Sequence, residues 1–435
     1  MNNTRRSRQR HAWLTLCAAA IGVFAFAANP ASAQCQYEVT AIIEGPPCWP
    51  SNFPAVLMGR GMNSYGHVVG SWQMCLETAD EAFYWTPETG LVTMTRPAGV
   101  TSAIAYDIND HGQIVGGHQV NGVGWKGFVY DIKTQHYTYL EPLHAWPVPL
   151  HILSSLNAIN NAGIAVGSRV ISKPGVSPTV SNAVIWDTNT GEVIDLGVGD
   201  GPNSAGEDGT DSNGAGGWSG GAFYFSADAR GLLWIKERVI ELEVLPGMVQ
   251  NSVRAVNNHL DAVGTSGDGT AGGTLRFLWL DGVMTEFLPP KGYDRAIPSD
   301  INDSRQIVGS MRIQGTSTFH PYLWQYGVFH DLRDLIVRVP PNLTITGASE
   351  IGNGGRIRAG GTGIGNVALV LAPVGQPTAD FDHNCRVDVR DLLILLDAWG
   401  PILRAKRQTA SPADLNEDGV VDVSDLLILL ANWSI

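Results

Sequence analysis

Two acid-rich segments near the C-terminus contain the residues best suited to chemistry. Both place oxygen-bearing side chains at positions 1, 3, 5, 9 and 12 of a twelve-residue stretch, and the second begins 34 residues after the first. Calcium takes six to eight oxygen ligands, and such a loop supplies them from these side chains and from the backbone carbonyl at position 7. The expected ligands are Asp380, Asp382, Asn384, Arg386 (carbonyl), Asp388 and Asp391 in the first loop, and Asp414, Asn416, Asp418, Val420 (carbonyl), Asp422 and Asp425 in the second. The sequence therefore predicts two Ca²⁺ sites.

Each loop is followed by an apolar segment that predicts a helix. Residues 392–399 read LLILLDAW and residues 426–433 read LLILLANW. Two tandem matches, each with nearly the same helix, favour metal loops over the alternative of acid-rich turns without metal. Five consecutive apolar residues cover more than one face of a helix, so we expect part of this surface to meet a partner. The alternative is that it packs on the rest of the protein.

These features together resemble a type I dockerin, in which a calcium loop and a single helix are duplicated and position 12 is Asp rather than Glu. The resemblance covers residues 380–435 and implies a small α-helical, tandem EF-hand-like domain that docks to a cohesin-like module when calcium is bound. The chain departs from the pattern at Cys385, which stands in place of the position-6 glycine, so we expect the first loop to bind Ca²⁺ more weakly than the second. Positions 10 and 11 are Val389-Arg390 and Val423-Ser424, where cohesin-binding dockerins often carry Ser-Thr.

The preceding part of the chain is organised by a repeat of about fifty residues. Its core is Asn-x-x-Gly-x-x-x-Gly, clearest in Asn109–Gly116, and the later copies lose one of the defining residues. A fixed period of this length is typical of a propeller or an array. The first positions of the seven copies are Asn63, Asn109, Asn160, Asn213, Asn257, Asn302 and Gly352.

An aromatic residue follows each asparagine by about twenty-two positions, with Leu371 at this place in the last copy, and short runs of β-branched and aromatic residues lie between turn residues. Such runs predict strands, so each unit is expected to be a four-stranded antiparallel sheet. Residues 37–43 precede the first unit and the last unit lacks a fourth strand, so this early strand is expected to complete it and close the ring. The fold class is therefore all-β, a roughly seven-bladed β-propeller, with six or eight blades as alternatives.

The pattern Ala-x-x-Ile-Asn-x-x-Gly-x-Ile-Val-Gly, followed by an aromatic strand, resembles the HAF repeat of bacterial extracellular proteins. The resemblance covers about residues 37–372. It implies secretion and a β-propeller-like architecture, and it names no activity or catalytic residue.

The N-terminus predicts export. Four arginines, an apolar run and Ala31-Ser-Ala33 form a secretory signal peptide over residues 1–33, and no other run is long enough to span a bilayer. The mature chain is then divided into the propeller (34–372), a linker (373–379) and the calcium domain (380–435). We expect a secreted, extracellular protein, with the periplasm or the cell surface as alternatives.

The charge and the cysteines limit the partners and the covalent structure. Loss of the four arginines leaves 24 basic against 41 acidic residues, a net charge of −17, which favours cations and disfavours nucleic acid as a partner. Four cysteines remain after the signal peptide, and they allow up to two disulfides in three connectivities, which the sequence leaves open. They are Cys35, Cys48, Cys75 and Cys385.

No motif identifies a reaction. Gly217-Trp-Ser-Gly-Gly221 matches the Gly-x-Ser-x-Gly pattern of serine hydrolases, but the following residues predict a strand where a nucleophile elbow requires a helix. We expect a non-catalytic propeller that binds a glycan or a protein and is attached through its calcium domain. The alternative is a carbohydrate-active enzyme, an O-glycosyl hydrolase of polysaccharide catabolism, with a carboxylate pair on the propeller.

Overall fold

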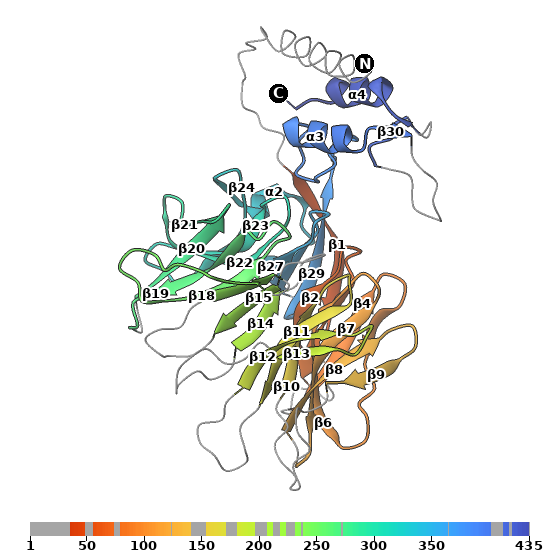
Figure 1. Cartoon of the computed structure of the whole chain (residues 1–435), viewed down its shortest axis with the longest axis vertical. Helices are drawn as coiled ribbons and strands as arrows, with labels where there is room; N and C mark the ends of the chain where they lie inside the picture. The colour runs from red at the N-terminus through yellow and green to blue at the C-terminus, as the bar shows by residue number, and fades with distance from the viewer. Residues whose placement is uncertain are drawn as a thin grey trace, which may run out of the picture.

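The computed structural model describes residues 35–47, 55–73, 79–122, 124–140, 154–170, 181–195, 207–211, 218–222, 231–235, 238–270, 273–363, 365–401, 412–416 and 420–434. Within these ranges the chain forms a ring of β-sheets with a small helical module at one end (Figure 1). None of the helices described in these ranges is long and apolar enough to cross a membrane.

Six of the sheets have four strands, and each strand pairs antiparallel with the next one along the chain. In chain order they are β2–β5 (Val56–Met62, Val68–Gln73, Asp80–Thr86, Gly90–Thr93), β6–β9 (Val100–Ile108, Gln113–Val120, Gly124–Asp131, His136–Tyr139), β10–β13 (Ser154–Ile159, Ile164–Val170, Ser181–Asp187, Val193–Asp195), β14–β17 (Glu207–Asp211, Trp218–Ala222, Gly231–Ile235, Arg238–Glu241), β18–β21 (Gln250–Val256, Ala262–Gly267, Thr274–Leu280, Val283–Glu286) and β22–β25 (Tyr293–Ile301, Ile307–Ile313, Phe319–Gln325, Val328–Asp331).

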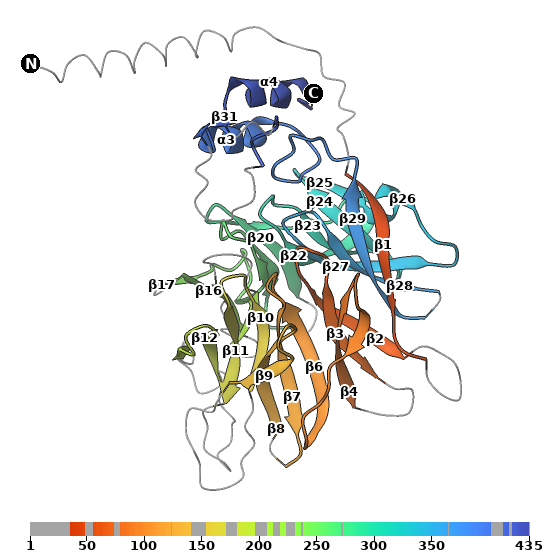
Figure 2. The ribbon, with the colours of Figure 1, turned by 90° about the vertical axis from the view of Figure 1, so that its right-hand side faces the viewer.

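The sheet that closes the ring has five strands. It consists of β27 (Thr344–Ile351), β28 (Ile357–Thr362), β29 (Val367–Val374), β1 (Gln36–Glu44) and β26 (Ile336–Arg338), the last following the short helix α2 (Leu332–Leu335). The N-terminal strand β1 pairs antiparallel with β29, as predicted, and β26 pairs in parallel with the other edge of β1 (Figure 2). The first strands of successive sheets contact one another, and β2 contacts β27, so the sheets form a β-propeller.

The prediction of seven four-stranded blades is therefore wrong, because the number of four-stranded blades is six. Six blades have four strands, and the closing sheet has five because both β1 and β26 join it. A three-residue strand such as β26 lies outside the repeat pattern, which is why the spacing of the repeats could not indicate it.

The apolar residues of the repeat form cores between neighbouring blades. Val69 and Tyr84 of the first blade pack with Ile108, Ile114 and Phe128 of the second. The predicted anchors, aromatic in all copies but the last, lie in the third strand of their sheets, opposite the residue five positions after the first position of the repeat. Examples of these pairs are Val68 with Trp85, Ile114 with Tyr130, Ile307 with Trp324 and, in the closing sheet, Ile357 with Leu371.

The repeat asparagines of the described turns join neighbouring blades. The Asn109 side chain accepts hydrogen bonds from the backbone N–H groups of His111 and Gln113, at 3.1 and 3.0 Å, which shapes the turn between β6 and β7. Its Nδ2 donates to the carbonyl of Asn160, the same position of the next blade, at 2.9 Å. Asn63 bonds Asn109 in the same way. The asparagine therefore recurs because it serves a turn and an inter-blade bond at once.

Copies that lack the first repeat glycine keep its backbone conformation. Gly112 has φ +82°, and the equivalent Leu260 and Arg305 have φ +66° and +57°. A β-carbon costs about 1–2 kcal/mol in this region. At Arg305 the side chain offsets this cost, because its Nε donates to the buried Asp261 carboxylate of the preceding blade at 2.7 Å.

Two carboxylates tie the inner strands of adjacent blades beside the central channel. Asp107 accepts hydrogen bonds from the N–H groups of Ile108 and of Ile159 in the next blade, both at 2.8 Å. Asp300 accepts from Ile301 at 2.8 Å and from Ile351 of the closing sheet at 2.7 Å. Burial and the nearby Glu350 charge raise the pKa of Asp107 to about 8 and that of Asp300 to about 7.

We therefore expect thermal stability to fall as the pH rises from about 4 to about 8. Both carboxyls stay protonated in the folded state to a higher pH than in the unfolded chain, so the unfolded state loses protons first and stability declines over this window. Melting curves in saturating calcium at pH 5 and pH 8 measure the effect. The double variant Asp107→Asn/Asp300→Asn should lose most of the difference, whereas the exposed control Glu286→Gln should keep it. An equal pH dependence in the double variant would contradict the assignment.

Candidate calcium-binding module

The C-terminal module is built from two copies of one unit. Helix α3 (Val389–Asp397) follows the first loop and helix α4 (Val423–Ala431) follows the second, and β30 (Gly400–Pro401) pairs with β31 (Val420–Val421). The buried core repeats with the 34-residue offset of the loops, so the two copies are related by pseudo-symmetry. Its members are Ala379, Val387, Leu395, Ala413, Val421 and Leu429.

The first loop brings its predicted side chains together. Asp380, Asp382 and Asp391 each offer a carboxylate oxygen, and these oxygens lie within 4.8 Å of one another. Asp380 accepts hydrogen bonds from the N–H groups of Asn384 and Cys385, at 2.9 and 2.7 Å, which wraps the backbone around the cluster. The described residues of the first loop thus fit a cation with oxygen ligands.

The position-12 carboxylate organises both loops in the same way. Asp391 accepts from the N–H groups of Phe381 and Asp388, at 2.7 and 2.9 Å. Asp425 accepts from Leu415 and Asp422 at the same distances, 2.7 and 2.9 Å. Asp388 and Asp422 also cap the helices that follow, each in a capping box with the position-12 residue. Asp418 of the second loop lies outside the described residues.

The electrostatics of the first loop favour a positively charged ligand. Burial and the neighbouring carboxylates raise the pKa of Asp380 to about 7 and that of Asp382 to about 6. Burial also raises the pKa of Asp391. Carboxyl groups that repel one another in a partly buried site are stabilised by a bound cation. The chemistry of the donor set therefore agrees with the calcium ligation predicted from the sequence.

Position 6 of the first loop is joined covalently to the propeller. Cys385 has φ +66°, the left-handed conformation expected of the missing glycine. It forms a disulfide with Cys35, which lies directly before β1, across a sequence separation of 350 residues. Cys48 and Cys75 lie outside the described residues, so the sequence-level question of connectivity is answered for one pair.

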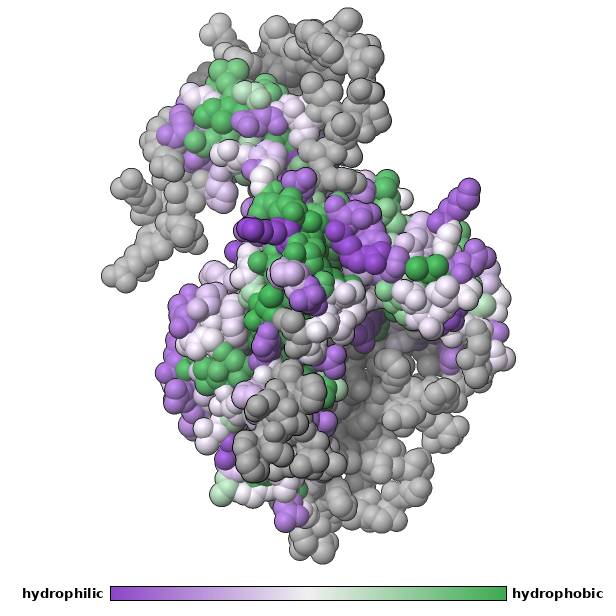
Figure 3. All heavy atoms as spheres, turned by 180° about the vertical axis from the view of Figure 1, so that it is seen from behind, coloured by the Kyte–Doolittle hydropathy of each residue, from purple (hydrophilic) through white to green (hydrophobic). Residues whose placement is uncertain are grey.

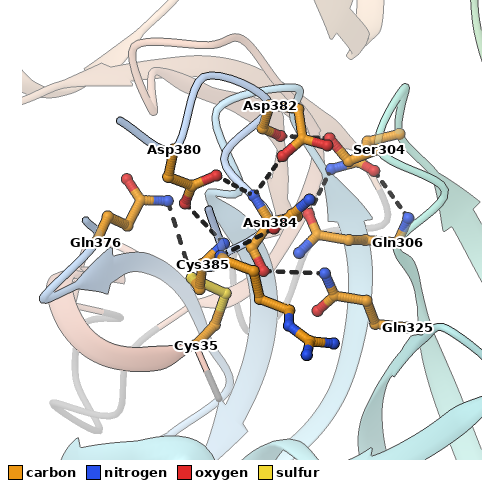
Figure 4. Close-up of a disulfide and its surroundings, with 11 residues drawn as sticks. Cys35, Ser304, Gln306, Gln325, Gln376, Asp380, Asp382, Asn384 and Cys385 are labelled. Carbon is orange, nitrogen blue, oxygen red and sulfur yellow. Dashed lines mark hydrogen bonds between the residues drawn. A yellow bond between two sulfur atoms is a disulfide. The ribbon is translucent and has the colours of Figure 1, made fainter. Parts of the chain in front are cut away.

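The first loop also packs on the propeller through contacts that no sequence pattern indicates. Ser304 Oγ donates to the Asp382 carbonyl, and Gln325 Nε2 donates to the Asn384 carbonyl at 3.0 Å (Figure 4). Both donors come from the blade β22–β25, and Ser304 belongs to its repeat turn. Strand β29 ends at Val374, so only a few residues separate the propeller from the first loop.

A cation–π contact extends this interface. The ring of Tyr326 lies under the guanidinium groups of Arg386 and Arg390, whose Cζ atoms are 5.7 and 5.1 Å from the ring centroid. Arg390 is position 11 of the first loop, one of the two positions that departs from the dockerin pattern. Tyr326 carried no signal in the sequence, because it is a tyrosine at a hairpin turn far from the tail.

The two helices leave an apolar surface exposed. Pseudo-symmetric residues are exposed to nearly the same fraction: Val389 and Val423 at 57% and 58%, Leu393 and Leu427 at 60% and 62%, and Leu396 and Leu430 at 47% and 48%. Hydrophobic surface of this module is seen at the top of Figure 3. We call these six residues the helical apolar face. The propeller therefore leaves these six residues uncovered, and the expectation that part of this surface meets a partner stays a prediction.

The remaining site-related expectations concern other parts of the chain. Ser219 of the Gly-x-Ser-x-Gly match lies within strand β15, Trp218–Ala222, rather than at a strand-to-helix turn. This position excludes the nucleophile-elbow geometry for that serine. The predicted signal peptide, residues 1–33, lies outside the described residues.

Comparison with known proteins supports the fold. Residues 58–198, which span the first three blades, match the family model described as a protein of unknown function (DUF3466). No curated protein matches the chain in sequence. The β-propeller domain of the Trilobed protease from Pyrococcus furiosus, described as having an open velcro topology, is 11% identical with a TM-score of 0.50, over 74% of this chain and 96% of that one.

Two peptidase structures give weaker matches. A prolyl endopeptidase matches at 9% identity and a TM-score of 0.49, over 75% of this chain and 51% of its own, and the acylaminoacyl peptidase of Pyrococcus horikoshii at 12% and 0.46, over 71% and 49%. This chain thus spans about half the length of those two enzymes. At such identities the similarity concerns the fold alone, and the chain is a β-propeller similar to that of the Trilobed protease.

Proposed function

We propose that this protein is a secreted, non-catalytic β-propeller binding protein, attached through its calcium-loaded C-terminal module to a cohesin-type partner or an extracellular assembly. The observation that carries the proposal is the helical apolar face, which is duplicated at equal exposure on α3 and α4. A soluble module that leaves six large apolar side chains uncovered on matching helix positions is typical of a docking surface. The resemblance to HAF repeats and the predicted signal peptide support export.

The residues of the propeller favour binding over catalysis. Asp107 and Asp300 each use both carboxylate oxygens to accept backbone N–H groups that join adjacent blades. Such carboxylates serve the architecture and are poorly placed to protonate a leaving group. The helical apolar face therefore supports attachment, whereas the channel carboxylates give no support to the glycan-cleaving alternative.

The test is binding of the full chain to a purified type I cohesin module, measured by biolayer interferometry with calcium and with chelator. We expect binding in calcium and none in chelator. The double variant Leu393→Asp/Leu427→Asp places two charges in the helical apolar face and should weaken binding at least tenfold. Leu288→Asp is the matched control, because Leu288 is exposed to 62% on the propeller.

Calcium-independent binding, or equal loss with the Leu288 control, would argue against this surface. If the type I cohesin does not bind at all, the cohesin-type partner is wrong.

A further inference from the structure

The propeller encloses a central cavity of about 860 Å³. This is within the size range of pockets that hold small molecules. In six of the units the residue three positions before the first position of the repeat lines the cavity. These residues are Arg60, Tyr106, Asn157, Arg254, Ser299 and Ser349. We call them the channel ring.

The channel ring varies where the rest of the repeat is regular. The asparagine and the inward-facing apolar residues recur because blade packing needs them, whereas the ring position holds cationic, aromatic, amide and hydroxyl side chains in different blades. A position that faces a cavity and has no packing role is free to differ between units. The side chains at this position therefore indicate what the cavity can bind, and they say little about how the blades pack.

The acidic groups that line the cavity already have partners. Asp107 and Asp300 accept backbone N–H groups, and Asp110 accepts from the Ser64 N–H at 2.9 Å and from Asn161 Nδ2 at 2.8 Å. Glu350 accepts from Arg358 Nε at 3.0 Å. Arg358 also donates to the carbonyls of Gly59 and Arg60, both at 2.6 Å.

Two cations of the channel ring have no anionic partner among the described residues. The Arg60 guanidinium lies over the Tyr106 ring, 5.1 Å from its centroid, and its Nε is buried with no hydrogen-bond partner in the described structure. Arg254 lines the same cavity from another blade with an exposed side chain. An anion in the cavity would pair with guanidinium charge that no carboxylate among the described residues neutralises.

The remaining lining favours a hydroxylated ligand. Asn157, Ser299 and Ser349 of the ring, together with Ser310 and Thr346, present amide and hydroxyl groups at the cavity wall. These groups donate to and accept from hydroxyls, and a guanidinium binds a carboxylate through two parallel hydrogen bonds. Tyr106 lies under the Arg60 guanidinium, in a cation–π contact.

We propose that the channel ring binds a carboxylate-bearing sugar, such as a uronic acid, with Arg60 and Arg254 holding the carboxylate and the polar ring residues contacting the hydroxyls. This inference rests on the proposed role of the propeller as a binding module and names its ligand class. It involves no residue of the helical apolar face, so the cohesin test and the channel test can fail separately.

The test is isothermal titration of the full chain, in calcium, with D-galacturonic acid, with neutral D-galactose and with acetate. We expect galacturonic acid to bind more tightly than either of the others, because only it offers both a carboxylate and ring hydroxyls. Arg60→Gln and Arg254→Gln should each weaken galacturonic acid binding about tenfold or more, as expected for a lost charge-assisted pair. Arg338→Gln, an exposed arginine on β26, removes the same charge outside the channel and should bind as the parent does.

Unchanged melting temperatures of the variants would show that each remains folded. The Arg60 carbonyl still accepts from Arg358 in Arg60→Gln, so the blade contact is retained. If galacturonic acid does not bind, if galactose or acetate binds equally well, or if the Arg338 variant loses as much affinity as the channel variants, the proposal is overturned.

Discussion

Deletion of residues 34–44 is expected to prevent the propeller from folding stably, far beyond the effect of an ordinary terminal truncation. The deletion removes β1, in which Tyr37 and Ile43 are fully buried, and leaves one edge of β29 and of β26 without a partner. Loss of a single large core side chain typically costs 2–5 kcal/mol, and whole domains have only about 5–15 kcal/mol of stability. Circular dichroism and differential scanning calorimetry of the truncated protein measure the loss.

The deletion also removes Cys35, so a control separates the strand from the disulfide. Cys35→Ser keeps β1 and removes only the cross-link to Cys385. In the chain-entropy model a loop of this length contributes roughly 5–6 kcal/mol, so this variant should be destabilised but folded. A synthetic peptide of residues 35–45, added to the truncated protein, should restore part of the lost stability by pairing with β29. A truncated protein that melts within a degree or two of the parent would show that β1 does not close the ring.

The isolated tail, residues 378–435, should be largely unfolded in chelator and become helical when calcium is added. Its helices have nine residues each, which is too short for stable helices in isolation, and its core contains six fully covered apolar residues. Asp380, Asp382 and Asp391 gather their oxygens within 4.8 Å, so without a cation their repulsion opposes the folded loop. Far-ultraviolet circular dichroism should show a large gain of helix with calcium. Asp391→Asn should lose most of this response and Asp397→Asn, outside the loops, should keep it; an identical spectrum in chelator and calcium would contradict the prediction.

Calorimetric titration of the reduced, isolated tail with calcium should show two sites of unequal affinity. Cys385 occupies a left-handed conformation that costs about 1–2 kcal/mol for a residue with a β-carbon, which corresponds to roughly a five- to thirtyfold weaker first loop. Cys385→Gly should narrow the gap. In the oxidised full chain the disulfide, Ser304 and Gln325 hold the first loop in place, so the two sites should differ less there.

The repeat spacing was sufficient to predict the sheets, because each landmark has one structural role. The asparagine shapes a turn, and the anchor lies in the third strand. Residues 37–43 form a strand that completes the last sheet, which lacked a fourth strand in the repeat pattern. The same reasoning treated Leu260 and Arg305 as signs of weaker copies. Their positive φ angles show that the turn is kept without glycine, and at Arg305 the ion pair with Asp261 compensates for it. Such compensation depends on residues of another blade and is invisible in a local pattern.

The gathering of Asp380, Asp382 and Asp391 was also predictable residue by residue, because ligand spacing within twelve residues is a local property. The docking of the first loop was not. Cys35 and Cys385 are 350 positions apart, and four cysteines leave three connectivities, so only the closed ring shows that the two sulfurs meet. The sequence did not indicate the partners of the first loop, Ser304, Gln325 and Tyr326. They are ordinary polar residues near blade turns, and they contact the tail only because the fold places it against them.

The disulfide has a mechanical consequence for a protein held by its tail. A pull on the C-terminal module is transmitted to the end of β29 at Val374, which pairs with Gln36 at the start of β1. Tension applied there would peel the two antiparallel strands apart one hydrogen bond at a time, the weakest way to load a strand pair. The bond between Cys35 and Cys385 bridges that same end and carries the force past the first rungs of the ladder. The disulfide thus reinforces the end of the strand pair at which separation of β1 and β29 would begin.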